Sequence, residues 1–204
     1  MDQIGGVLHE PTGTPVGGVA LTHGAGGSRE SPMLVAICDE WARRGWLAVR
    51  YNLPYRQRRP KGPPSGSSAS DRAGILESVS AIRRRVDGRP VLAGGHSYGG
   101  RLTSMAVADD GLELDGLTLF SYPLHPPGKP ERARTEHLPR ITVPTVFTHG
   151  TADSFGTIQE LREAAALIPA GTEIVEITGA RHDLGSKRFD VPALAVDAAL
   201  RLLD

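Results

Sequence analysis

The sequence of 204 residues contains a single cysteine and no excess of charge of either sign. Cys38 cannot form a disulfide within the chain, and its apolar neighbours favour a place in the core. Because 23 Lys and Arg residues balance 23 Asp and Glu residues, the overall charge attracts neither nucleic acid nor a membrane. No apolar stretch near the N-terminus is long enough for a signal peptide or a membrane span, which predicts a cytoplasmic protein. H-E-x-x-H motifs and cysteine clusters are also absent, so we expect no metal.

Short apolar segments alternate with amphipathic ones along the whole chain. Strands are predicted at residues 17–24, 46–51, 89–95, 114–123, 143–150 and 172–178, and helices at 31–45, 71–86, 98–108, 156–168 and 190–203. The alternation predicts a single α/β domain over residues 1–204, in which helices cover both faces of a mostly parallel sheet. Residues 53–70 are basic and rich in Pro, Gly and Ser, and are predicted to form a loop. Sites in such sheets lie at the carboxyl ends of the strands.

The segment GGHSYGG, at residues 94–100, surrounds one serine with glycines between a predicted strand and a predicted helix. It lacks the lysine of a P-loop, and GAGGSR at residues 24–29 does not fit G-x-G-x-x-G. It does contain G-x-S-x-G, the nucleophile elbow, in which a tight turn raises the Ser97 hydroxyl above the sheet. Gly95 and Gly99 leave the room that this turn requires. A glycine-rich turn whose serine only caps the next helix is the alternative.

A serine hydroxyl becomes a good nucleophile when a base takes its proton and an acidic residue orients that base. In nucleophile-elbow enzymes the acid and then the base follow the serine along the chain. Asp153 follows the fifth predicted strand and His182 follows the last one, so both lie at carboxyl ends. We therefore predict a catalytic triad of Ser97, Asp153 and His182. His149 is the alternative base and Asp183 the alternative acid, but His149 can bond within its own turn and Asp183 points elsewhere on steric grounds.

Backbone N–H groups near Ser97 are predicted to form an oxyanion hole. One donor is Tyr98, directly after the nucleophile, and the second is Ala25 or Gly26, in the loop HGAGG after the first predicted strand. We expect His23 to brace that loop rather than to act as a base.

Three side chains are candidates for the substrate pocket: Tyr122, His125 and Arg56. Tyr122 and His125 leave a predicted strand at its carboxyl end, although the neighbouring prolines favour a structural role in a rigid turn. Arg56 belongs to the basic segment YRQRRPKG, at residues 55–62, which is suited to attract a carboxylate or a phosphate. A solvated loop is the other interpretation of this segment.

Six segments of the chain together resemble the α/β-hydrolase superfamily, and within it a branch of small members without a lid domain. They are LTHGAGG, YNLPY, GGHSYGGR, SYPLHPPGKPE, EHLPRITVPTVFTHGTAD and GARHDL. The resemblance spans residues 16–204. This branch includes small bacterial hydrolases, a testis-expressed vertebrate protein and a domain of a subunit of the NSL histone acetyltransferase complex. The resemblance implies the fold, the triad and the oxyanion loop, but no settled substrate. Dienelactone hydrolases are similar in size, but they typically carry a cysteine where this chain has Ser97.

These features predict a serine hydrolase that cleaves a small carboxylic ester or a related acyl compound through an acyl-enzyme, without a cofactor. Acyl transfer or amide hydrolysis by the same triad is an alternative. A non-catalytic interaction module on the same fold is another, because a chromatin-associated relative shares the fold and fold does not fix function.

Overall fold

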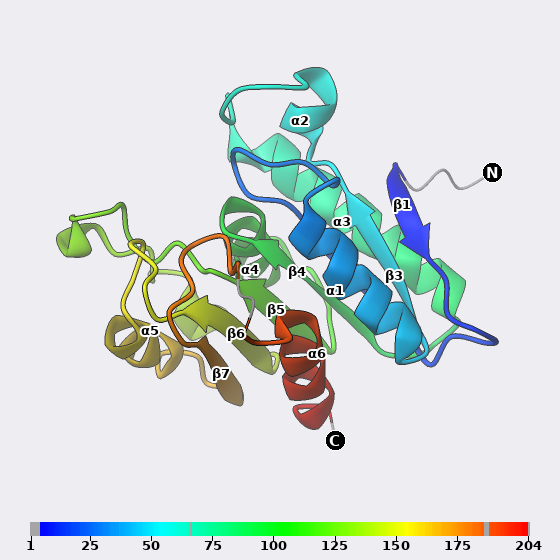
Figure 1. The fold of residues 1–204 in the computed structure, drawn as a ribbon. Coiled ribbons are helices and arrows are strands. Elements are labelled where there is room, and N and C mark those ends of the chain that lie inside the picture. Colours follow the sequence, from blue (N-terminus) through cyan, green and yellow to red (C-terminus); the bar gives the residue numbers. More distant parts are fainter. Residues whose placement is uncertain (1–4, 66, 186–187, 204) are drawn as a thin grey trace.

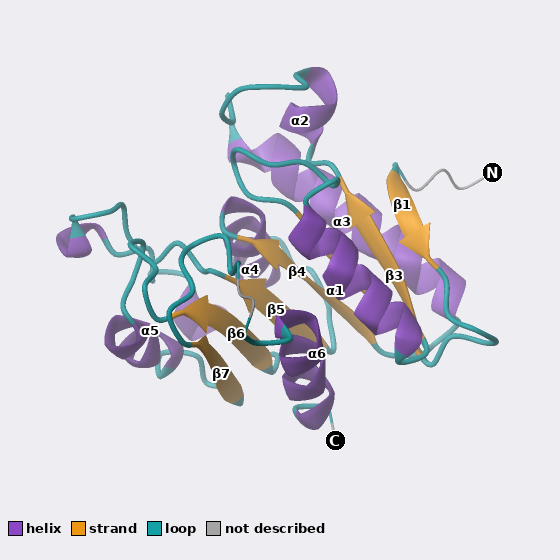
Figure 2. Cartoon of the chain, in the orientation of Figure 1, coloured by secondary structure: helices purple, strands orange, loops and turns teal. Residues whose placement is uncertain are grey.

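The computed structural model describes residues 5–65, 67–185 and 188–203. The elements in these residues are β1 (Gly6–His9), β2 (Gly17–Thr22), α1 (Pro32–Arg43), β3 (Trp46–Tyr51), α2 (Pro54–Arg58), α3 (Ser68–Val86), β4 (Val91–His96), α4 (Tyr98–Asp109), β5 (Gly116–Phe120), the short 3-10 helices η1 (Pro130–Arg132) and η2 (Leu138–Arg140), β6 (Thr145–Gly150), α5 (Ile158–Ala165), β7 (Thr172–Ile177) and α6 (Val191–Arg201). Figure 1 follows them along the chain, and Figure 2 separates helices, strands and loops.

The strands form one sheet in the order β1-β3-β2-β4-β5-β6-β7. Every neighbouring pair is parallel except β1 and β3, which run antiparallel at the edge. The predicted, mostly parallel α/β architecture is therefore confirmed. Because β4, β6 and β7 are parallel, their carboxyl ends all reach the same edge of the sheet.

Helices cover both faces of the sheet (Figure 1). Buried side chains of α1 and α6 form one apolar cluster with one face of the strands, and those of α3, α4 and α5 form a second cluster with the other face. Cys38, on α1, is buried in the first cluster, where burial raises the pKa of its thiol to about 12. In the described part of the chain, no helix combines the length and the apolar character that a membrane crossing requires.

Two elements near the N-terminal half differ from the sequence-based expectation. β1 is a half-buried edge strand of four residues, and its pairing with β3 decides its conformation more than its own sequence does. α2 interrupts the predicted loop of residues 53–70. Pro54 stands at its first turn, where the missing N–H costs nothing, and Leu53 and Tyr55 anchor it in the core.

Candidate active site

Ser97 occupies the turn between β4 and α4. Its backbone has φ 49° and ψ −114°, a region that residues with a side chain rarely adopt, so this turn stores strain. The Ser97 N–H donates to the carbonyl of Phe120 at 2.8 Å, which fixes the turn to the end of β5. The hydroxyl is thereby held at the carboxyl edge of the sheet, at the N-terminus of α4.

The glycines around Ser97 are required by space. A Cβ atom at any of four positions would collide with a backbone oxygen of a neighbouring segment: Gly94, Gly95, Gly99 and Gly100. The sequence pattern identifies Gly95 and Gly99 as the positions that need to be small, and the structure adds the two outer ones. The turn can therefore sit directly against β2 and β5.

A chain of hydrogen bonds connects Ser97 with residues far away in the sequence. The Ser97 hydroxyl and His182 Nε2 are 2.8 Å apart, and His182 Nδ1 lies 2.8 Å from Asp153 Oδ2. In the tautomer that this chain requires, Nδ1–H donates to the carboxylate and Nε2 accepts from the serine. The structure thus brings together the three residues of the predicted triad. Asp183 instead accepts from the Gly185 N–H and is exposed.

Asp153 has a buried carboxylate that is held as an anion. Burial raises the pKa of Asp153, but hydrogen bonds from His182 and from the Phe155 N–H, at 2.9 Å, outweigh it, so this pKa lies below its ordinary value. His149 Nε2 is 3.7 Å from the same carboxylate, but its N–H donates to the carbonyl of Gly156 at 2.9 Å. Burial lowers the pKa of His149 and keeps the ring neutral, so His149 supports the loop around Asp153.

Two rings that the sequence did not single out position His182. The ring of Phe155 stacks on the imidazole with centroids 4.2 Å apart and planes at 29°. On another side, His96 Nε2 donates to the backbone carbonyl of His182 at 2.7 Å. Phe155 covers the imidazole and His96 fixes its backbone, so the base has little freedom to leave Ser97. Neither residue belongs to a motif that assigns this role.

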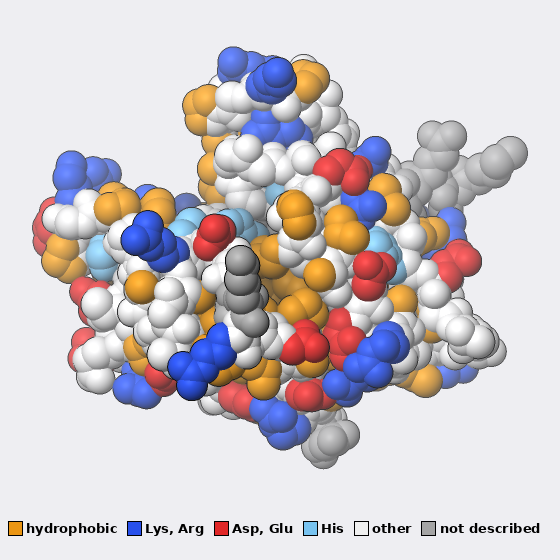
Figure 3. Space-filling view, viewed as in Figure 1, with side chains coloured by type: hydrophobic (Ala, Val, Ile, Leu, Met, Phe, Trp, Pro, Cys, Tyr) orange, Lys and Arg blue, Asp and Glu red, His pale blue; other side chains and the backbone are white. Residues whose placement is uncertain are grey.

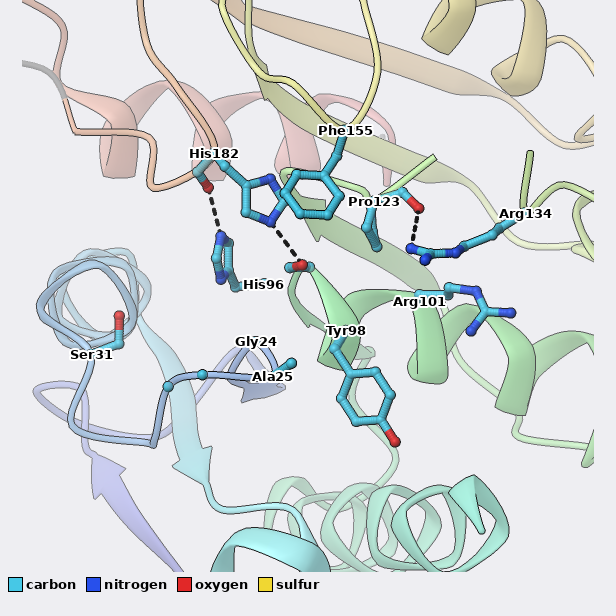
Figure 4. A pocket seen from close by; sticks show the side chains of 13 residues that line it. Gly24, Ala25, Ser31, His96, Tyr98, Arg101, Pro123, Arg134, Phe155 and His182 are labelled. Atoms are coloured by element: carbon cyan, nitrogen blue, oxygen red, sulfur yellow. Dashed lines mark hydrogen bonds between the residues drawn. The ribbon is translucent and has the colours of Figure 1, made fainter. Parts of the chain in front are cut away.

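The loop after β2 and Ser97 line the same cavity. Figure 4 shows Gly24 and Ala25 of this loop beside it. Hydrogen bonds to other described residues are absent for the N–H groups of Ala25, Gly26 and Tyr98. The carbonyls of Gly24, Ala25 and Gly27, in contrast, are occupied. Ala25 O accepts from the Tyr55 hydroxyl at 2.7 Å and from Arg56 Nη2 at 3.1 Å. This arrangement leaves the N–H groups of Ala25 and Gly26 available to a ligand, whereas the Gly27 N–H donates to Gly24 O at 3.0 Å.

Arg56 is a brace of this loop and does not line the cavity at Ser97. Its side chain is buried at 4% exposure, and Nε donates to Gly27 O at 2.8 Å. His23 has a similar role, as expected: Nδ1–H donates to Gly24 O at 2.8 Å and Nε2 accepts from the Leu53 N–H at 3.2 Å. Burial lowers the pKa of His23 to about 4, so the ring is neutral.

Asp71, at the start of α3, links α2 to the site. It is buried, and its two oxygens accept from the Tyr55 N–H at 2.9 Å and from the Tyr98 hydroxyl at 3.0 Å. Asp71 therefore ties Tyr98, the residue after Ser97, to α2, which braces the loop after β2. This role depends on contacts between distant segments, so no sequence pattern reveals it.

The other two pocket candidates also lie away from the cavity at Ser97. Tyr122 is buried in the core, where its hydroxyl donates to the carbonyl of Arg134 at 2.9 Å. His125 Nδ1–H donates to Pro126 O at 2.8 Å, and its ring lines a separate depression next to α5. Both side chains support the turn after β5, which is the structural alternative that the neighbouring prolines favour.

The cavity itself has a volume of about 660 Å³, within the range of small-molecule sites. Its walls come from the loop after β2, the Ser97 turn and the start of α4, and segments after β5, β6 and β7: Gly24, Ala25, Gly26, Gly27, Ser31, His96, Ser97, Tyr98, Arg101, Pro123, Arg134, Phe155 and His182. Figure 3 shows basic and acidic side chains interspersed over one face of the molecule. Among the described residues, no group of three or more His, Cys, Asp or Glu side chains is arranged to hold a metal.

Residues 16–192 match a protein family described as an alpha/beta hydrolase domain. The fold is similar to that of Est1E from Butyrivibrio proteoclasticus, which is 16% identical, with a TM-score of 0.76 over 97% of this chain and 93% of Est1E. A dienelactone hydrolase from Anabaena variabilis is 20% identical, with a TM-score of 0.71 over 97% of this chain and 88% of that one. A serine hydrolase without a lid from Xanthomonas campestris is 16% identical, with a TM-score of 0.72 over 95% and 87%. At these identities the similarity shows a shared fold.

Proposed function

The chain belongs to the alpha/beta hydrolase family, and we propose that it is a serine hydrolase that cleaves a carboxylic ester or a related acyl compound. The observation that carries the proposal is the hydrogen-bonded chain from Ser97 through His182 to Asp153, which opens on the cavity. Ser97 then attacks the acyl carbon while His182 Nε2 takes the hydroxyl proton. Asp153 stabilises the resulting imidazolium.

The negative charge that develops on the carbonyl oxygen needs donors that are already in place. The N–H of Tyr98 and that of Ala25 or Gly26 fit this role, because they have no other partner in the described residues and border the cavity. His182 returns its proton to the leaving alcohol, which departs and leaves the acyl group on Ser97. A water that gives its proton to His182 then hydrolyses this ester bond and restores the enzyme.

Labelling by a fluorophosphonate, read by intact mass, tests whether the serine is activated. We expect one adduct on the wild type and none on Ser97→Ala, whose turnover of short-chain esters falls by several orders of magnitude. Ser154→Ala is the matched control, because Ser154 is an exposed neighbour of Asp153 outside the cavity lining. A wild type without an adduct, or a Ser97→Ala variant with near-full turnover, would exclude the proposed role of Ser97. A labelled wild type that turns over no ester would favour acyl transfer to another acceptor.

A further inference from the structure

Two arginines, Arg101 and Arg134, line the cavity beside Ser97. Figure 4 shows both side chains on the opposite side of the cavity from Gly24 and Ala25. Neither arginine forms an ion pair with any residue in the described part of the chain. Other arginines nearby do have acidic partners, since Arg140 pairs with Asp109.

The backbone fixes both arginines relative to the nucleophile. Arg101 follows Ser97 by four residues on α4, and its N–H donates to the Ser97 carbonyl at 2.9 Å, so both side chains lie on one helix face. Arg134 is held by its N–H, which donates to Leu124 O at 2.8 Å, and by its carbonyl, which accepts from the Tyr122 hydroxyl. Arg134 Nη1 also donates to Pro123 O at 3.0 Å, which orients the guanidinium.

Among residues 5–65, 67–185 and 188–203, no acidic side chain forms an ion pair with either arginine of this wall. Arg101 Nε is buried and has no hydrogen-bond partner, and an unpaired buried donor of a charged group is costly. Both guanidinium groups line the same cavity, and burial, and then repulsion from Arg101, lower the pKa of Arg134. An anion between them would supply acceptors for the free N–H groups and relieve the repulsion.

We propose that Arg101 and Arg134 form an anion subsite, so that the acyl compound cleaved at Ser97 carries a second group that is a carboxylate. The proposal rests on the proposed function and specifies its substrate class. Guanidinium groups bind planar carboxylates through paired N–H donors, and a cavity of about 660 Å³ accommodates a small acidic ester as well as the reacting group. Anion recognition is therefore assigned to this wall, whereas Arg56 is occupied as a brace.

The first test compares two pairs of esters that differ only in charge. Monoethyl adipate and ethyl adipamate place a carboxylate or a neutral amide on the acyl side, whereas acetoxyacetate and acetoxyacetamide place it on the alcohol side. We expect the wild type to favour the acid in one of the pairs by about 10- to 100-fold in kcat/KM, the range of a hydrogen-bonded charge contact. The pair that shows the preference identifies the side of the ester that faces the arginines.

Variants connect the preference to the two side chains. Arg101→Gln and Arg134→Gln should each lower kcat/KM for the acid by about 10-fold or more and change it for the amide by less than about threefold. The kcat/KM of Arg101→Lys for the acid should lie between that of Arg101→Gln and that of the wild type, because lysine keeps the charge but lacks the paired N–H donors of a guanidinium. Arg59→Gln is the control, since Arg59 is exposed and outside the cavity lining. Thermal unfolding of each variant reports whether it is folded.

Binding to Ser97→Ala separates this proposal from the proposed function. We expect calorimetry to show tighter binding of the preferred acid than of its amide, and loss of this difference when Arg101→Gln is added. If the wild type hydrolyses neutral esters but neither acid is preferred or bound more tightly, the anion subsite is refuted while the hydrolase proposal stands. If no ester is hydrolysed but the acid binds in an Arg101-dependent way, the subsite stands without the hydrolase. An acid preference that persists in the double Gln variant also refutes the subsite.

Discussion

Replacing Arg56 by methionine removes the brace of the oxyanion loop and keeps a side chain of similar length. The guanidinium of Arg56 donates to four carbonyls, those of Gly27 at 2.8 Å, Gly62 at 3.0 Å, Ala25 at 3.1 Å and Arg59 at 3.2 Å. These bonds tie the loop after β2 to α2 and to the segment that follows it. Methionine fills the space but donates to none of them.

The magnitude follows from what replaces each bond. Arg59 and Gly62 are exposed, so water can take the place of Arg56, and Ala25 O keeps its bond to the Tyr55 hydroxyl. Gly27 O, which is only partly exposed, loses its one partner in the described chain. A hydrogen bond to a charged donor contributes about 1.5–3 kcal/mol, and removal of a buried cation offsets part of the loss. We expect the free energy of unfolding to fall by about 2 kcal/mol.

Catalysis should weaken for every substrate, because the loop positions donors and does not select a ligand. Complete loss of one oxyanion donor costs about 10²–10³-fold in kcat, so a displaced loop is expected to cost about 10-fold. Urea denaturation and kcat/KM for monoethyl adipate and ethyl adipamate measure the two effects. Arg58→Met is the control, since Arg58 is exposed and its side chain has one hydrogen bond to the described residues, to the Ser70 hydroxyl at 3.3 Å. An Arg56→Met variant with wild-type stability that fails only on the acidic ester would refute the bracing role.

Two further substitutions test the charges around the site. In Asp153→Asn, a single amide group replaces a carboxylate that accepts from both His182 Nδ1–H and the Phe155 N–H, so the catalytic tautomer of His182 is no longer fixed. We expect kcat to fall by about 10³–10⁴-fold while urea unfolding stays cooperative. A fall in kcat below about 10-fold would contradict the assignment of Asp153. For His23, burial lowers the folded pKa from 6.5 to about 4, so the unfolded chain binds more protons in this window and stability is lost as the pH falls through it. Between pH 7 and pH 5, the free energy of unfolding of the wild type should therefore fall by about 2 kcal/mol more than that of His23→Gln, as measured by urea denaturation. Equal losses in the two proteins would show that His23 is not held neutral.

Local sequence patterns predict the part of the site that depends on local geometry. The G-x-S-x-G turn needs its glycines within a few residues of Ser97, and Asp153 and His182 directly follow strands, so the fold class alone places them at one edge. The structure brings these residues within hydrogen-bond distance of one another. The same reasoning covers the five inner strands, β2 to β6, which are almost fully buried.

Features that arise from contacts between distant segments escape this reasoning. Arg56 lies in a basic, proline-rich stretch that is typical of a solvated loop. Its contacts with Ala25 and Gly27, about 30 positions earlier in the chain, are not visible in the sequence. Nothing in the sequence around Phe155 indicates its role, which arises from stacking on His182, a residue of a distant segment. β1, with four residues, is too short for its own sequence to predict a strand, and it becomes one through its pairing with β3.

The sequence distance between Ser97 and its partners has a consequence for biosynthesis. Ser97 reaches His182 across 85 positions of the chain, and His182 reaches Asp153 across 29. The hydrogen bond between His182 and Ser97 thus depends on β6 and β7 joining the sheet beyond β5. Contacts between segments that are far apart in sequence are slow to form. A nascent chain that has only reached α4 lacks both the Phe120 carbonyl, which fixes the Ser97 turn, and His182. The fraction of chains labelled at Ser97 would therefore report the fraction in which β7 has joined the sheet, and its increase with time would measure the rate of this last folding step.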